Sequence, residues 1–151
     1  GYFGSRLMKN IREEKGYTYG ISASHSGRAF DGYVGIATEC DTRHTWNVIS
    51  EVHREIKRLH DESIPPEELE TVRRYMLSDL AKTLDTPFNI ASYIGNMFCY
   101  GTYPTYLNEQ VKEIRNVTSR QLQDIARQYL DISKLRTVIV CDKNNLPKND
   151  E

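Results

Sequence analysis

The sequence predicts an α+β fold in which helices pack on one face of a mainly antiparallel sheet. The order of the patterns carries this prediction, because a short helix precedes two extended runs, a long helical stretch follows, and one apolar strand comes last. The extended runs cover residues 17–26 and 30–40, and alternating apolar and polar residues around a turn favour a hairpin. The last strand is expected over residues 136–141, where consecutive valine and isoleucine residues suit a strand buried on both faces.

A short helix is expected between Ser5 and Gly16. Serine is a favoured N-cap residue, and glycine is the usual residue at which a helix ends in a left-handed conformation. Between them, three apolar residues share one helix face: Leu7, Met8 and Ile11. A strand begins directly after the glycine, so this stretch is a junction at which a helix passes into the sheet.

Two residues at this junction are candidates for a functional site. Arg12 lies on the last helical turn, where a cation suits the negative end of the helix dipole, and Tyr19 follows seven residues later on the strand. This spacing lets the two side chains converge where the helix meets the strand. The structural alternative is that Arg12 is a solvated cation and that Tyr19 is half-buried on the strand face of Tyr17 and Ile21.

Five more helices are expected from apolar residues that recur every three or four positions. Their approximate ranges are 42–60, 66–84, 88–100, 106–114 and 118–130. Prolines, paired glutamates and capping residues mark their starts, as in the capping box of Thr118 and Gln121. No repeat or linker interrupts the series, so residues 1–142 are expected to form a single domain, followed by a polar tail at 143–151 that frays.

Composition excludes some classes of function. The net charge of −1 and the lack of a basic stripe argue against a nucleic-acid-binding domain. No apolar run is long enough for a membrane-spanning helix, and the cellular compartment stays unknown. The three widely spaced cysteines form no metal or disulfide pattern, and His53 and His60 lack the spacing of a zinc-binding helix. No metal or other cofactor is therefore expected in this chain.

The opening stretch resembles a known family. Residues 5–7, residues 11–16 and Tyr19 are similar to the start of the C-terminal, non-zinc domain of the inverted-zincin metallopeptidases. This family includes insulin-degrading enzyme, pitrilysin and the mitochondrial processing peptidase. The Glu-Glu-Leu run that ends at Leu69 and the Val-Thr pair that ends at Thr118 also resemble that domain. The resemblance covers nearly the whole chain.

The resemblance implies that the chain is the substrate-binding and transition-state-assisting half of a zinc-dependent metallopeptidase. In the family, an arginine and a tyrosine at the separation of Arg12 and Tyr19 contact the peptide substrate and the oxyanion formed during hydrolysis. Zinc is implied in a sister domain or partner subunit that carries a His-x-x-Glu-His motif. Because that motif is absent here, the chain alone is expected to be inactive. The family also contains non-catalytic subunits, so a scaffold or partner-binding role is the alternative.

The resemblance also implies a truncated, inactive half-domain of the metallopeptidase type. In the family this domain begins with a strand and a helix ahead of the glycine-rich entry, and both are expected to be missing here. A domain without that first strand exposes a sheet edge, and exposed edges pair readily with other chains. Self-association through this edge is therefore expected.

Overall fold

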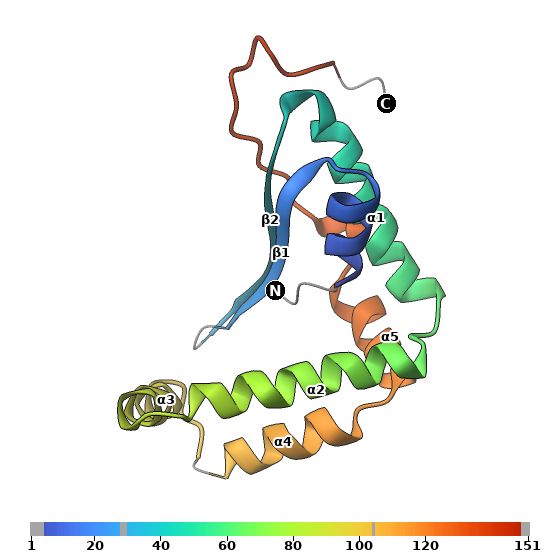
Figure 1. Cartoon of the computed structure of the whole chain (residues 1–151). Coiled ribbons are helices and arrows are strands. Elements are labelled where there is room, and N and C mark those ends of the chain that lie inside the picture. Colours follow the sequence, from blue (N-terminus) through green and yellow to red (C-terminus); the bar gives the residue numbers. More distant parts are fainter. Residues whose placement is uncertain (1–4, 28–29, 104, 149–151) are drawn as a thin grey trace. The chain divides into compact units, whose positions relative to one another are not determined.

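The computed structural model of the chain describes residues 5–27, 30–103 and 105–148. These residues form an α+β fold with six helices, two short 3₁₀ turns and one two-stranded antiparallel sheet (Figure 1). In chain order the elements are η1 (Met8–Glu14), β1 (Thr18–Gly27), β2 (Gly32–Cys40), η2 (Thr42–His44), α1 (Thr45–Asp61), α2 (Pro66–Thr83), α3 (Pro87–Cys99), α4 (Tyr106–Asn116), α5 (Ser119–Tyr129) and η3 (Ile132–Lys134). The predicted hairpin and the predicted series of helices are therefore confirmed.

The first of two compact units contains the described residues up to His25, residues 34–62 and the described residues from Gln123 onward. Its core lies where η1 and α1 pack against the hairpin. The buried members of this core are Met8, Ile11, Ile21 and Val48, and the half-buried residues against them are Leu7, Tyr17, Ile36, Cys40 and Val52. Residues from η1, both strands and α1 thus meet in one apolar cluster, so this unit has a core of its own.

Within the same unit, the C-terminal end of α1 is tied to α5. The carbonyl oxygen of His60 accepts hydrogen bonds from Gln123 Nε2 at 2.9 Å and from Arg127 Nε at 2.8 Å. The ring nitrogen Nε2 of His60 lies 3.1 Å from the carbonyl oxygen of Ala126. The last carbonyls of a helix have no partner inside the helix, so these side chains satisfy a group that would otherwise need water.

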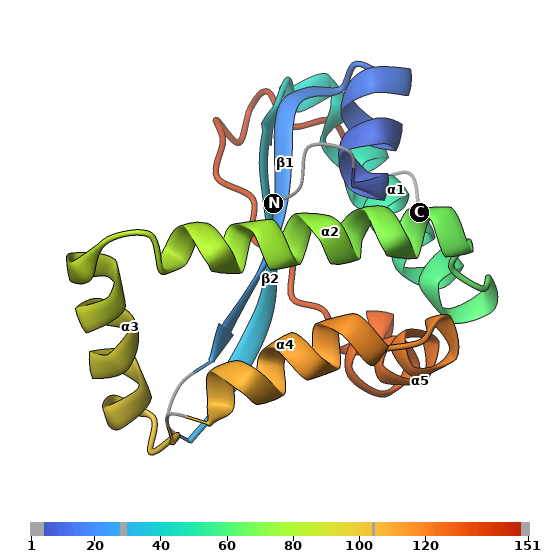
Figure 2. The ribbon, with the colours of Figure 1, turned by 60° about the horizontal axis from the view of Figure 1, so that its bottom comes forward.

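The second unit contains α2, α3 and α4 together with the described residues of the hairpin tip. Helices α2 and α4 lie side by side in both ribbon views (Figures 1 and 2). Arg73 of α2 joins them, because its Nε donates to the carbonyl oxygen of Ile114 and its Nη2 donates to that of Val117, both at 2.9 Å. The hydroxyl of Tyr93 on α3 donates to Gln110 Oε1 of α4 at 2.6 Å.

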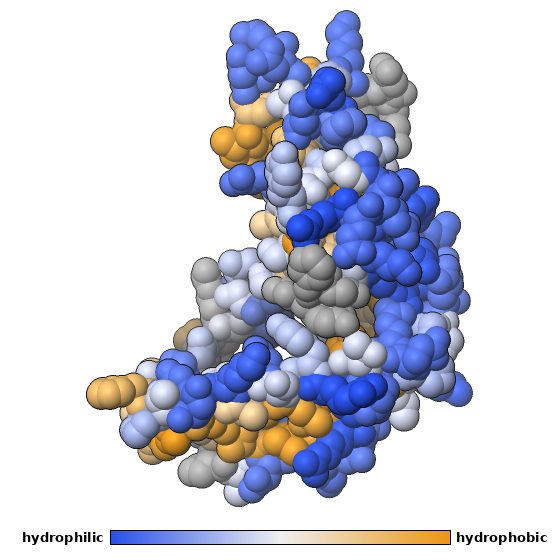
Figure 3. All heavy atoms as spheres, in the orientation of Figure 1, coloured by the Kyte–Doolittle hydropathy of each residue, from blue (hydrophilic) through white to orange (hydrophobic). Residues whose placement is uncertain are grey.

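The second unit buries few side chains. Among its described residues only Met97 is buried, at 7% exposure. Apolar residues gather on the surface of these helices in the space-filling view (Figure 3). The exposed large apolar side chains of α2, α3 and α4 are Tyr75, Met76, Phe88, Ile90, Ile94, Phe98 and Tyr106. This unit therefore has one buried side chain among its described residues, and side-chain hydrogen bonds link its helices.

The predicted third strand at residues 136–141 is wrong. The backbone there pairs with no strand among the described residues, whose one sheet consists of β1 and β2. Val138 is 85% exposed and Val140 is 94% exposed, so the predicted burial on both faces is also wrong. An apolar run forms a strand only when a neighbouring strand bonds its N–H and C=O groups, and the described chain supplies no such neighbour to this segment.

The sequence signals for helix ends predicted the structure better than the apolar run at residues 136–141 did. The N–H of Gln121 donates to Thr118 Oγ1 at 3.3 Å, and the N–H of Thr118 donates to Gln121 Oε1 at 2.9 Å. This reciprocal pair is the predicted capping box. Thr86 caps α3 in the same way, because its Oγ1 accepts the N–H of Asn89 at 3.2 Å. Local hydrogen bonds of this kind set the helix boundaries.

Candidate functional site

Helix η1 is wound more widely than an α-helix. It is a π-helix, in which the N–H of Lys15 donates to the carbonyl oxygen of Asn10, five residues earlier, at 3.1 Å. Ser5 precedes the helical turn that leads into η1, and its Oγ accepts the N–H of Met8 at 3.4 Å, as expected for the predicted cap. The predicted stop is confirmed, since Gly16 has a left-handed φ of +64°. Short π-helical segments occur frequently at functional sites.

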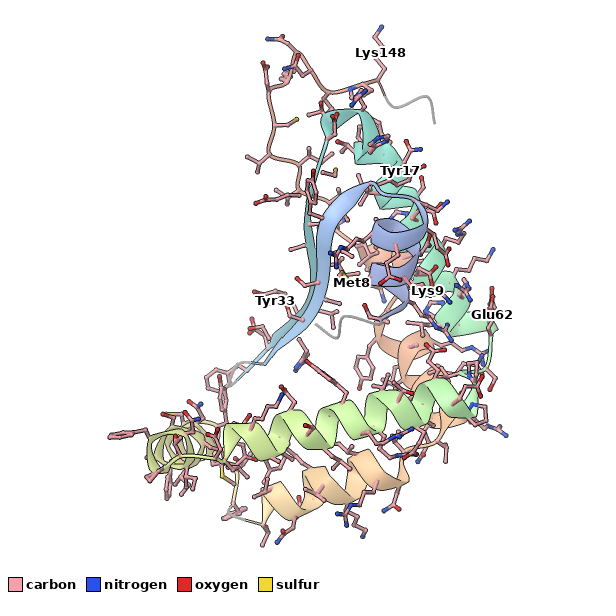
Figure 4. The ribbon with its side chains drawn as sticks, viewed as in Figure 1. Met8, Lys9, Tyr17, Tyr33, Glu62 and Lys148 are labelled. Carbon is pink, nitrogen blue, oxygen red and sulfur yellow. The ribbon has the colours of Figure 1, made fainter. Side chains whose placement is uncertain are left out.

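Met8 closes the junction between η1 and β1. Its sulfur atom accepts a hydrogen bond from the N–H of Ile21 at 3.4 Å, and both residues are buried. Figure 4 shows Met8 between the helix and the strand. A thioether is a weak acceptor, but it occupies an N–H group that a strand edge otherwise presents to solvent or to another chain. Helix η1 is thereby held against β1.

The start of β1 and the residue before it, Tyr17, are anchored on η2 and β2. The ring of Tyr17 stacks on His44, with ring centroids 4.6 Å apart and an angle of 23° between the planes. Thr18 is buried, and its hydroxyl lies 2.8 Å from Thr38 Oγ1 and 2.6 Å from the carbonyl oxygen of Glu39. The same hydroxyl oxygen accepts the N–H of Gly20 at 3.1 Å. The backbone on both sides of Tyr19 is therefore fixed.

The structure places the two predicted site residues at this junction. Arg12 is half-buried on the last turn of η1, and its carbonyl oxygen accepts the N–H of Gly16 at 3.1 Å. Tyr19 lies in β1 and is 98% exposed. The alternative in which Tyr19 is half-buried on the strand is therefore wrong. A tyrosine on a fixed backbone with a solvated ring and hydroxyl is able to contact a second molecule.

A buried polar cluster beside the junction was not predicted. Asn10 is 5% exposed, and its Nδ2 donates to Glu51 Oε2 at 2.9 Å and to Glu55 Oε1 at 2.7 Å. Glu55 is 3% exposed and also accepts from Arg58 Nη1 at 3.1 Å. A signal for this cluster exists in the sequence: an asparagine on the apolar face of the short helix, and two glutamates four residues apart on the next long one.

Glu51 connects this cluster to the end of η1. Its Oε1 lies 3.0 Å from Lys15 Nζ, and its Oε2 lies 2.5 Å from Arg54 Nη2. Partial burial works to raise the pKa of Glu51. Hydrogen bonds from Asn10 and Lys15 and the charges of Arg54 and Lys15 outweigh burial, so the pKa of Glu51 lies below its ordinary value of 4.5.

The possible metal ligands of the described residues do not cluster. No three His, Cys, Asp or Glu side chains lie close enough together to hold an ion in that part of the chain. None of the helices in residues 5–27, 30–103 and 105–148 combines the length and apolar character needed to cross a membrane.

Two curated proteins are similar to most of this chain. The uncharacterized zinc protease YmxG of Bacillus subtilis is 24% identical over 148 residues, which cover 97% of this chain and 36% of that protein. The non-peptidase homolog YmxG of Helicobacter pylori is 21% identical over 147 residues, or 95% of this chain and 33% of that protein. The chain thus spans about a third of the length of these relatives.

Solved structures share the fold. A crystal structure of a peptidase M16 inactive domain from Pseudomonas fluorescens superimposes with a TM-score of 0.79 and 21% identity, covering 89% of this chain and 32% of that one. A protease from Helicobacter pylori superimposes with a TM-score of 0.70 and 13% identity, covering 86% of this chain and 32% of that one. At these identities the likeness establishes the fold alone.

The family described as the peptidase M16 inactive domain matches residues 1–76, which is just over half of the 151 residues. The matched range contains η1, the hairpin, α1 and the first part of α2. It also contains Arg12 and Tyr19. The resemblance inferred from the opening motif is thereby confirmed, and the chain belongs to the peptidase M16 inactive-domain family.

Proposed function

We propose that this chain is the substrate-holding half of a zinc-dependent peptidase. In this proposal Arg12 and Tyr19 donate hydrogen bonds to the carbonyl oxygen of a bound peptide and to the oxyanion that replaces it during hydrolysis. The chain alone does not cleave peptides. A separate domain or subunit with a His-x-x-Glu-His motif supplies the zinc and the general base.

The observation that carries the proposal is the exposure of Tyr19. Its ring is 98% exposed, although the residues around it are stacked, buried or hydrogen-bonded. Large aromatic side chains cost little entropy when they bind, and they are enriched where proteins contact other molecules. The backbone of Tyr19 is fixed and its phenol is exposed to solvent. Its hydroxyl is therefore well placed to donate a hydrogen bond to a substrate.

Arg12 fits a complementary role. It lies at the C-terminal turn of η1, just before the left-handed Gly16, so its guanidinium is carried by a helix end that packs on the core. A guanidinium stays charged at every pH at which a peptidase works. A donor aimed at the charge that develops on the carbonyl oxygen stabilises the transition state more than the substrate. The two residues together would therefore assist hydrolysis without carrying it out.

Zinc does not fit the described residues of this chain, because no group of three possible ligands occurs among them. In this proposal the metal belongs to the sister domain. Zinc-assisted hydrolysis needs an open coordination position on the metal and a general base beside it. In this proposal the sister domain supplies both.

The test is hydrolysis of a quenched, mixed-sequence peptide by the zinc-loaded, full-length product of the gene and by the chain alone. The full-length protein is expected to cleave, and the chain is expected to be silent. Arg12→Ala and Tyr19→Phe are each expected to lower turnover of the full-length protein by roughly 10²–10³, the usual effect of removing one oxyanion donor. An effect below about tenfold in well-folded protein would remove these residues from the proposal.

Two matched controls separate chemistry from surface changes. Tyr129→Phe removes a hydroxyl from a tyrosine that is 69% exposed on α5. Arg74→Ala removes a guanidinium whose side chain is 72% exposed on α2. Neither lies at the junction, so both are expected to leave turnover within about twofold, as for most surface substitutions.

A non-catalytic scaffold is the second candidate function. It is favoured by one observation, namely that a Helicobacter pylori relative is named a non-peptidase homolog. If a folded, zinc-loaded, full-length protein cleaves no peptide in a diverse set, the scaffold becomes the better proposal. The search would then turn to proteins that copurify with it.

A further inference from the structure

The amide of Asn10 has an unusual position for a polar group. It lies on the face of η1 that also carries Met8 and Ile11, and it is 5% exposed. Its oxygen is buried and accepts no hydrogen bond from the described residues. A buried polar atom without a partner costs stability. Any contribution of this amide to the position of η1 therefore comes from its Nδ2 group.

The hydrogen bonds of Asn10 orient η1 relative to α1. Its Nδ2 donates to two carboxylates on α1, to Glu51 at 2.9 Å and to Glu55 at 2.7 Å. Charged acceptors make these bonds stronger than neutral ones, and an amide reaches both only in one orientation. Asn10 thus fixes both the distance between η1 and α1 and the rotation of η1 about its own axis.

The same helix is held at its other end. Lys15 Nζ lies 3.0 Å from Glu51 Oε1, so one carboxylate of α1 contacts residues on both sides of Arg12. Lys15 also donates its backbone N–H to the carbonyl oxygen of Asn10, which is the wide i to i+5 bond of the π-helix. A shift to α-helical bonding would turn Arg12 to a different side relative to these two anchors.

We propose that Asn10 is a positioning residue, which uses Glu51 and Glu55 to hold the wide turn of η1 and thereby sets the direction in which Arg12 is presented. The inference rests on the proposed function, in which Arg12 contacts the peptide. It adds that the glutamates of α1 contribute to turnover without touching the substrate.

The first test is a double-mutant cycle in the zinc-loaded, full-length protein. Asn10→Leu keeps the size of the side chain and removes both N–H donors. It is expected to lower kcat by about tenfold or more, the factor that corresponds to losing one hydrogen bond to a charged acceptor, with a smaller change in KM. In the Arg12→Ala background the same substitution is expected to cause no further loss, because it acts through Arg12. Losses that multiply would overturn the proposal.

The second test does not depend on activity. Hydrogen exchange of the peptide that covers residues 8–16 is measured by mass spectrometry in the same full-length proteins. Asn10→Leu removes donors from two carboxylates of α1, so the thermal midpoint is expected to fall, and exchange in residues 8–16 is expected to speed by about tenfold more than in the rest of the first unit. Unchanged exchange in η1 would overturn the proposal. Ile56→Val, which alters a buried residue of α1 outside the η1 core cluster, controls for general destabilisation and should leave exchange in η1 unchanged.

A second pair of variants covers the case in which Asn10→Leu does not fold. Glu55→Gln keeps an oxygen that accepts from Asn10, whereas Glu55→Leu removes it. The proposal expects the glutamine variant to retain most of the turnover and the slow exchange that the leucine variant loses. Equal loss in both would overturn it. If Arg12→Ala itself leaves turnover intact, the proposed function fails, and the exchange measurements still decide whether Asn10 holds η1.

Discussion

The two compact units of this chain are stabilised by different means. The first unit buries an apolar cluster from η1, the hairpin and α1, and it adds a polar cluster centred on Asn10. In the second unit, Met97 is the one buried side chain among the described residues, and hydrogen bonds from Arg73 and Tyr93 link its helices. Both predicted site residues belong to the first unit. In the proposed function, the two donors therefore lie in the unit that has a buried core.

The largest expected difference between the two units is the stability lost when an isoleucine is truncated. Ile11 is 0% exposed, so Ile11→Ala is expected to lower the free energy of unfolding by about 2–5 kcal/mol through lost burial and a residual cavity. Ile94 on α3 is 44% exposed, and Ile94→Ala is expected to change the free energy of unfolding by about 0.5 kcal/mol or less. Urea unfolding monitored by circular dichroism gives both values. Equal effects would show that the units do not differ in the way described.

Arg73 is expected to matter most in the second unit. Arg73→Met keeps much of the apolar stem and removes the hydrogen bonds to the carbonyl oxygens of Ile114 and Val117, so a loss of about 1–3 kcal/mol is expected. Arg74→Met is the control, since that side chain is 72% exposed. Hydrogen exchange in α4 locates the effect. Unchanged protection there would mean that Arg73 does not hold α4.

Low pH is expected to destabilise the first unit. The carboxyl groups with a lowered pKa include Asp41, Glu51, Glu62 and Asp131, all of which lie in that unit. A folded-state pKa below the unfolded one contributes stability above the unfolded pKa, and this contribution is lost as the pH falls through the folded value. For Glu51 the loss therefore begins below about pH 4.5.

Glu51→Gln tests this dependence. The variant is expected to be less stable at neutral pH and to lose less stability than the wild type when the pH falls below about 4.5. Glu113→Gln, at an exposed position of α4, is the control and should leave the pH profile unchanged. Parallel profiles for the wild type and Glu51→Gln would contradict the assignment.

The smallest expected effect is weak self-association of the chain through its unpaired extended segment. Val138 and Val140 are 85% and 94% exposed beside backbone groups that form no ladder in the described chain. Concentration-dependent dimerisation is expected in sedimentation, and Val140→Lys should weaken it by introducing a charge at the edge. Phe98→Lys, on the exposed surface of α3, tests whether the second unit is responsible instead. A strictly monomeric chain at high concentration would exclude both routes.

Sequence patterns predicted features that depend on neighbours along the chain. The end of η1 at Gly16 and the capping box of Thr118 and Gln121 are confirmed, because backbone conformation and hydrogen bonds a few residues apart determine them. The apolar periodicity of α1 was also recognisable, and the buried apolar residues of this helix are Val48 and Ile56. The placement of Arg12 and Tyr19 at the junction followed from the same local signals.

Features that depend on distant partners were missed. The run at residues 136–141 has strand-forming residues, but an apolar run alone does not supply a neighbouring strand. The contacts of Asn10 were not predicted, since its partners Glu51 and Glu55 lie 41 and 45 positions away. The wide turn of η1 was not expected either, because helix propensities do not distinguish i+4 from i+5 bonding.

The chain contains one tryptophan, Trp46, and its indole Nε1 donates to the carbonyl oxygen of Pro147 at 2.8 Å, 101 positions later in the chain. Trp46 is half-buried near the start of α1. Its fluorescence therefore reports on a single place, where the C-terminal segment meets the start of α1. Any condition that releases this segment will expose the indole to water and shift its emission to longer wavelength. The native sequence therefore contains an optical probe for that contact.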